Sequence, residues 1–88
     1  MTSKERARLR GLASKEETVV QIGKGGITES VVASVDTALT ARELVKGKVL
    51  ESSMLTAREA CVQLAEALGA EAIQVIGTKF VLYRKKPE

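Results

Sequence analysis

A short apolar run that ends in a cluster of glycines constrains this chain most. Residues 18–22 have the β-branched character of a strand, and residues 23–26 follow with the order Gly-Lys-Gly-Gly. Thr28 then stands where a helix N-cap belongs, ahead of a helical pattern over residues 29–42. Such a turn brings free backbone N–H groups and the positive end of a helix dipole to one place. Phosphate is the ligand that this arrangement suits best.

The patterns along the rest of the chain give the order of its elements. Thr-x-x-Glu capping boxes begin at Thr2 and Thr56, Gly69 suits a left-handed helix cap, and Gly77 suits a type II′ hairpin turn. We therefore predict a helix over about 3–13, a strand over 18–22, a helix over 29–42, a strand over 43–50, a helix opening after Thr56, and strands over 72–76 and 79–84. The predicted fold class is α/β, of the two-layer α+β type, with the order αβαβαββ. We expect one domain over residues 1–88, with a frayed tail at 85–88.

The first helix and the second strand both carry cations beside apolar residues. Leu9, Leu12 and Ala13 form the apolar stripe expected to dock the helix, and four cations lie at its margins: Lys4, Arg6, Arg8 and Arg10. In the second strand, Lys46 and Lys48 share one face. Gly47 between them predicts either a bulge, which would move both lysines, or close approach by a neighbouring element.

Basic residues are concentrated toward the two ends of the chain. Residues 1–15 hold five basic groups and one acid, residues 16–78 hold five basic groups and nine acids, and residues 79–88 hold four basic groups and one acid. If the ends meet in the fold, they form a positive face that attracts a polyanion. If they do not, these charges are solvated ends that aid solubility.

Composition argues against several classes of function. The chain has no histidine, and its one cysteine, Cys61, falls in an apolar helical pattern, which favours a small buried thiol. We expect no metal, no cofactor and no small-molecule substrate. No stretch approaches the roughly 18 apolar residues of a membrane span, and the N-terminus leads into charge, so we expect a cytoplasmic protein without a membrane partner.

The spacing of the glycines decides between kinds of phosphate site. Residues 23–26 fit neither the P-loop nor the dinucleotide fingerprint, but they fit Gly-x-x-Gly, with which KH modules clamp a nucleic-acid backbone. The same spacing also occurs in a plain strand-to-helix turn. Glu29, an acid in the first turn of the helix, favours the helix dipole but repels phosphate.

Four segments together resemble the CRM domain, the chloroplast RNA-splicing and ribosome-maturation domain, in its bacterial single-domain YhbY-like form. The segments are residues 9–13, 19–29, 43–49 and 75–84. The resemblance implies a mixed four-stranded sheet packed with helices, akin to the C-terminal domain of translation initiation factor three. It also implies binding to ribosomal RNA in large-subunit precursors, through the Gly-x-x-Gly loop and the adjacent basic surface.

The sequence thus leads to a non-catalytic RNA-binding protein, an assembly factor for the large ribosomal subunit. The predicted RNA-binding residues are Gly23, Lys24, Gly25, Gly26, Thr28, Arg10, Lys4, Arg6, Lys46 and Lys48. The main alternative is a protein-interaction module that reaches the ribosome without touching RNA. A small enzyme using the glycine turn as a phosphate cradle is disfavoured, because no nucleophile has a base nearby in the sequence.

Overall fold

The computed structural model describes residues 2–15 and 18–85, and the predicted element order is confirmed in it. Each predicted helix and strand begins and ends within two residues of its observed bounds. A short 3₁₀ helix, η1, was not predicted. Most of the predicted frayed tail, residues 86–88, lies outside the described residues. The elements are α1 (Ser3–Ala13), β1 (Val20–Ile22), α2 (Glu29–Arg42), β2 (Leu44–Val49), η1 (Glu51–Ser53), α3 (Ala57–Leu68), β3 (Glu71–Ile76) and β4 (Lys79–Tyr83).

The four strands form one mixed sheet in the order β1-β2-β4-β3. β1 runs parallel to β2, and the other neighbouring pairs are antiparallel. The β3–β4 hairpin turns at Gly77, whose φ of 58° is the positive value that a type II′ turn requires at its first central position. Thr28, Thr56 and Gly69 cap the helices as predicted, and the Thr56 capping box has both of its hydrogen bonds. The predicted α/β fold with a mixed four-stranded sheet is therefore confirmed.

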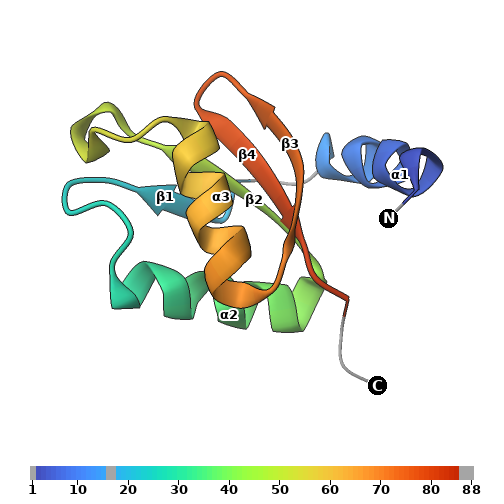
Figure 1. The fold of residues 1–88 in the computed structure, drawn as a ribbon, viewed down its shortest axis with the longest axis horizontal. Coiled ribbons are helices and arrows are strands. Elements are labelled where there is room, and N and C mark those ends of the chain that lie inside the picture. The colour runs from blue at the N-terminus through green and yellow to red at the C-terminus, as the bar shows by residue number, and fades with distance from the viewer. Residues whose placement is uncertain (1, 16–17, 86–88) are drawn as a thin grey trace.

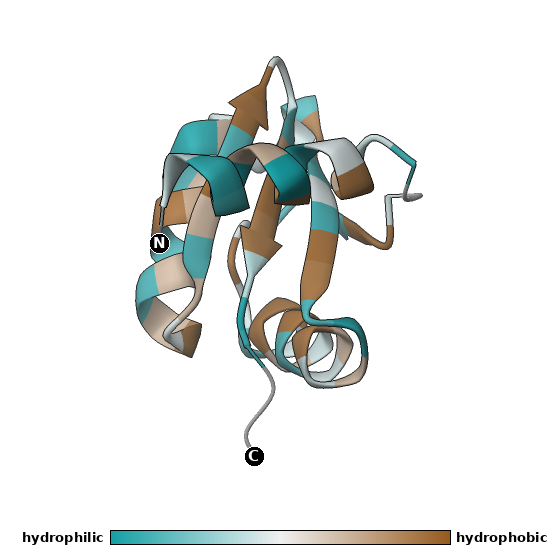
Figure 2. Cartoon of the chain, turned by 90° about the vertical axis from the view of Figure 1, so that its right-hand side faces the viewer, coloured by the Kyte–Doolittle hydropathy of each residue, from teal (hydrophilic) through white to brown (hydrophobic). Residues whose placement is uncertain are grey.

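One face of the sheet is covered by α2 and α3, which lie together in Figure 1, apart from α1. The core on this face draws alternate residues from the strands and the inner faces of both helices, and Figure 2 shows the hydrophobic strands enclosed between the helices. Phe80, Cys61 and Leu64 are completely or almost completely buried there. The fully buried members that fill most volume are Phe80, Ile22, Leu39, Leu64, Leu82, Val35, Val45 and Cys61.

The opposite face of the sheet is covered only in part, by α1. Leu9 and Ala13 pack there in a smaller cluster with Leu44, Ile73 and Val81. The prediction that Leu12 belongs to the docking stripe is wrong, because its side chain is 48% exposed. α1 instead contacts the sheet through Arg6, Leu9 and Ala13. These residues are three and four positions apart, so they lie on the same side of the helix. Arg6 completes this contact by donating a hydrogen bond from Nη1 to the Ala72 carbonyl oxygen at 3.0 Å.

Gly47 marks a close approach and not a bulge. β2 pairs one-to-one with β4 from Leu44 opposite Tyr83 to Lys48 opposite Lys79. The irregularity in the sheet lies instead in β3, between Ala72 and Gln74. Because the pairing of β2 is continuous, Lys46 and Lys48 keep the common face that the alternation predicted.

Candidate nucleic-acid interface

The glycine turn is a tight β-turn that leaves its lysine at the tip. The Gly26 N–H donates to the Gly23 carbonyl oxygen at 3.0 Å, and Gly25 and Gly26 have φ values of 101° and 67°. A side chain is strained at such angles, so glycine is needed at both positions. Lys24 is exposed at the second position of the turn. The turn thus combines bare backbone with one positive charge, as a phosphate contact requires.

The segment that follows β2 supports the turn from behind. A Cβ at Gly26 would lie 3.4 Å from Cδ1 of Leu55, and one at Gly23 would lie 3.5 Å from Cδ1 of Leu50. Thr28 caps α2, because its Oγ1 accepts a hydrogen bond from the Val31 N–H at 3.3 Å. The glycine turn is therefore held by packing on one side and by the helix cap on the other.

Three lysines share the partly uncovered face of the sheet. In β2, Lys46 and Lys48 alternate with residues of the α2–α3 core and so face the α1 side. Lys79 of β4 lies opposite Lys48 and has the same orientation as Val81, a member of the α1 cluster. In Figure 1, β2 and β4 run between the glycine turn on the left and α1 on the right. Cations thus extend across the sheet from near the turn toward α1.

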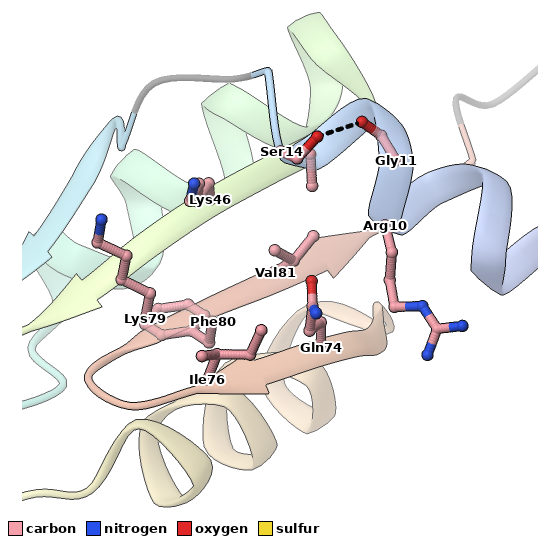
Figure 3. A pocket seen from close by; sticks show the side chains of 10 residues that line it. Arg10, Gly11, Ser14, Lys46, Gln74, Ile76, Lys79, Phe80 and Val81 are labelled. Atoms are coloured by element: carbon pink, nitrogen blue, oxygen red, sulfur yellow. Dashed lines mark hydrogen bonds between the residues drawn. The ribbon is translucent and has the colours of Figure 1, made fainter.

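A groove lies where α1 meets this lysine-bearing face. Its volume is about 500 Å³, and Figure 3 shows Arg10 on one side of it and Lys46 and Lys79 on the other. Among the described residues that line it, none is acidic. The described residues that line it are Arg10, Gly11, Ala13, Ser14, Lys46, Gln74, Ile76, Lys79, Phe80 and Val81. The groove joins a cation from the basic N-terminal region to one from the basic C-terminal region, so those two parts of the chain do meet.

Other chemistry finds little support in the described part of the chain. No group of three or more histidine, cysteine, aspartate or glutamate residues there is placed to hold a metal ion. Cys61 is fully buried, and desolvation by burial raises the pKa of its thiol to about 11, which removes the thiolate at neutral pH. No helix in residues 2–15 and 18–85 has the length and apolar character needed to cross a membrane.

The sequence of the whole folded region matches one family. The model of the CRS1/YhbY (CRM) domain covers residues 1–84. This chain belongs to the CRM domain family.

Two curated relatives match this CRM domain over about nine tenths of their own length. The Probable RNA-binding protein YqeI of Bacillus subtilis is 31% identical over 100% of this chain and 92% of its own length. A Haemophilus influenzae protein named RNA-binding protein is 34% identical over 100% of this chain and 89% of its own. The names point to RNA-binding proteins and not to enzymes.

A solved structure shares the CRM fold. SAV1595 of Staphylococcus aureus, a hypothetical protein proposed to bind RNA, is 37% identical in its solution structure and superposes with a TM-score of 0.79. The match covers 100% of this chain and 92% of that one. The resemblance to the CRM domain is therefore confirmed.

The structure brings only some of the predicted site residues of this CRM domain together. Arg10 and Lys46 line the groove, and Lys48 follows Lys46 on the same face of β2. The residues from Gly23 to Thr28 form the turn at the far end of β1. Lys4 is exposed on α1 but does not line the groove. Arg6 already donates to a backbone carbonyl, which gives it a structural role in docking α1.

Lys79 and Gln74 line the groove but were not among the predicted site residues. Lys79 could have been found, because the Gly77 turn fixes the hairpin register and places Lys79 on the face of Val81. Gln74 could have been found in the same way, because the register set by that turn pairs it with Val81, on the same face.

Proposed function

We propose that this chain is a non-catalytic RNA-binding protein that acts as an assembly factor on ribosomal RNA in precursors of the large subunit. The observation that carries the proposal is the row of cations on the open sheet face, Lys48, Lys79 and Lys46, continued by Arg10 across the groove. RNA-binding relatives and the CRM family support the class of partner. The ribosomal target rests on the resemblance stated above.

In this proposal the glycine turn and the sheet lysines have different tasks. The turn, from Gly23 to Gly26, lets a phosphate approach the backbone closely, with Lys24 adding charge. Lys46, Lys48 and Lys79 neutralise phosphates farther along the strand. Residues 1–88 act as one RNA-binding domain, in the cytoplasm, where the precursors assemble.

The affinity should come mainly from phosphate contacts. The chain has two aromatic residues, and Phe80 is 1% exposed while Tyr83 packs against the α1 cluster. Neither offers the open stacking platform of an RRM. Four to six phosphate contacts would give a plot of log K against log salt with a slope of roughly −3 to −5. A slope near zero would contradict electrostatic binding.

Crosslinking in cells tests the proposal directly. We expect ultraviolet crosslinking and sequencing of the attached RNA to recover large-subunit ribosomal RNA. The alternative, docking on the ribosome through protein alone, predicts no such crosslinks. It also predicts that nuclease treatment leaves the association intact, whereas binding through RNA predicts its loss.

A further inference from the structure

We infer that the groove between α1 and the sheet holds one unpaired nucleotide of the RNA. This inference rests on the proposed function and deepens it, because it names the class of RNA preferred: a stem with a bulged nucleotide, in place of a fully paired stem. The base would enter the groove while the neighbouring phosphates remain on the cations at its sides.

The groove has the size and composition of a site for a small planar ligand. Its volume of about 500 Å³ falls within the range of roughly 300–1,000 Å³ that ligand sites usually occupy. Ile76 supplies exposed apolar surface in the groove, since this residue is 64% exposed, and Val81 lines the groove beside it. An extruded base is normally held against apolar or aromatic side chains of this kind.

One polar side chain in the groove is suited to contacting the edge of a base. Gln74 projects from β3 between Ile76 and Arg10 in Figure 3 and is partly buried. Its amide offers both a donor and an acceptor. The Ser14 hydroxyl donates its hydrogen to the Gly11 carbonyl oxygen at 2.7 Å, so it is not free to donate to a ligand. The hydroxyl oxygen of Ser14 can still accept a hydrogen bond. A base in the groove would thus meet a two-way hydrogen-bonding group beside an apolar floor.

Gly11 supplies an independent reason to expect an occupant. It lies inside α1, where glycine is unfavourable, and a Cβ added there would meet no protein atom within 4 Å. Neither packing nor a positive φ requires a glycine at this position. Because Gly11 lines the groove, its missing side chain leaves space for a ligand at the α1 wall.

The cations decide in favour of a nucleotide over a neutral ligand. Arg10, Lys46 and Lys79 surround the apolar floor, and no acid is present among the described lining residues. A nucleotide matches this pattern, since its base is planar and largely apolar on its faces while its phosphates are anionic. A paired base cannot leave its stack without an energetic cost, so an unpaired nucleotide should enter preferentially.

The test compares two hairpin RNAs by fluorescence anisotropy. One has a fully paired stem, and the other has the same stem with a single bulged nucleotide, made with each of the four bases. We expect the wild-type protein to bind at least one bulged hairpin about tenfold more tightly than the paired hairpin. Equal binding to all the hairpins overturns the groove proposal but leaves the proposed function standing. Binding to none of them overturns both.

Matched variants locate the preference on the groove. Ile76→Ser and Gln74→Ala should abolish the preference for the bulge while changing affinity for the paired hairpin less than about twofold. The controls are Val75→Ser, at the next position of β3, which does not line the groove, and Gln63→Ala, on the exposed side of α3. Both should keep the preference. A preference that survives in both groove variants overturns the assignment.

A measurement on the wild-type protein covers the case in which a variant fails to fold. Titration with a short unpaired oligoribonucleotide should shift the NMR signals of the Gly11 amide, the Gln74 side-chain amide and the Ile76 methyl groups. Shifts confined to the glycine turn would place the unpaired nucleotide there and contradict the groove site.

Discussion

The ring of Phe80 occupies the space that a side chain at Gly47 would need. The two residues pair across β2 and β4, and a Cβ on Gly47 would lie 2.3 Å from Cζ of Phe80. Phe80 is 1% exposed and belongs to the core beneath α2 and α3. This contact lets β2 and β4 stay in continuous register, which keeps Lys46, Lys48 and Lys79 on one face.

Gly47→Ala should destabilise the protein strongly. The new methyl group would displace a buried ring in a packed core, and overpacking of this kind costs about 1–3 kcal/mol. We expect the free energy of unfolding in urea to fall by roughly 2–3 kcal/mol. Phe80→Leu in the same chain should recover part of the loss, giving a favourable coupling energy in a double-mutant cycle. Purely additive effects would contradict the steric explanation.

Gly11→Ala should have the opposite effect on stability. The helix interior favours alanine, and the added methyl group meets no neighbour, so the free energy of unfolding should rise by about 0.5–1 kcal/mol. If a nucleotide enters the groove, the same variant should bind a bulged hairpin less tightly than the wild type does. If Gly11→Ala lowers the free energy of unfolding, the added methyl group must meet other atoms of the protein, and the space beside Gly11 is not open to a ligand.

Arg84→Met should loosen the attachment of the C-terminal strand to the helices. Arg84 donates to the carbonyl oxygens of Leu68 and Asp36, each at 3.1 Å, and to Oγ1 of Thr40 at 3.0 Å. We expect a loss of about 2 kcal/mol in urea unfolding, since hydrogen bonds from a charged group are lost together. Asp36→Asn is the control: the Asp36 side chain is 54% exposed, and breaking its 2.7 Å ion pair with Arg84 should cost less than about 1 kcal/mol. If Arg84→Met and Asp36→Asn lower the free energy of unfolding equally, the ion pair and not the hydrogen bonds to the carbonyl oxygens explains the loss.

Lys24→Ala should weaken binding to paired and bulged RNA alike without altering stability. Lys24 is exposed at the tip of the turn, so its loss removes charge and no packing. We expect the slope of log K against log salt to shrink by about 0.7–0.9, the value of one phosphate contact. The control is Arg58→Ala, which removes one charge from the exposed side of α3. If both variants weaken binding equally, net charge and not the turn is responsible.

Gly26→Asp should weaken RNA binding more than Lys24→Ala does. It adds a negative charge and a side chain where a phosphate would approach, at a backbone φ of 67° and 3.4 Å from Leu55. Some loss of stability should accompany it, because a side chain is strained at this angle. Binding is therefore measured by anisotropy at a temperature where circular dichroism shows the variant folded. Unchanged binding by both folded variants would exclude the turn as a contact site.

Cys61 should make stability fall between pH 9 and pH 11. The pKa of its thiol rises from 9.0 to about 11 through desolvation, so in this window the unfolded chain has lost a proton that the folded chain keeps. Stability is therefore complete below pH 9 and declines as pH rises toward the folded pKa, by roughly 2–3 kcal/mol in all. The measurement is urea unfolding at pH 8 and pH 11 for the wild type and Cys61→Ala. The variant should lose less stability over this interval, because it lacks the thiol whose deprotonation favours the unfolded chain.

Local signals in the sequence were enough to predict the α-helices and strands of this protein and their order, though not η1. Capping residues such as Thr28 and Thr56 and terminators such as Gly69 act through hydrogen bonds and φ angles within a few residues of themselves. The common face of Lys46 and Lys48 is equally local, because alternation along a strand fixes it. These features do not depend on how distant segments pack, and the structure confirmed them.

Only the tertiary structure decided which residues meet. Pairing of β2 with β4 placed Lys79 beside Lys48, and the packing of Leu9 and Ala13 on the sheet exposed Leu12 and brought Arg10 to the groove. Each outcome depends on contacts between segments far apart in the chain, which no local pattern encodes. The glycine turn could thus be found in the sequence alone, whereas the groove exists only because α1 docks across the strands.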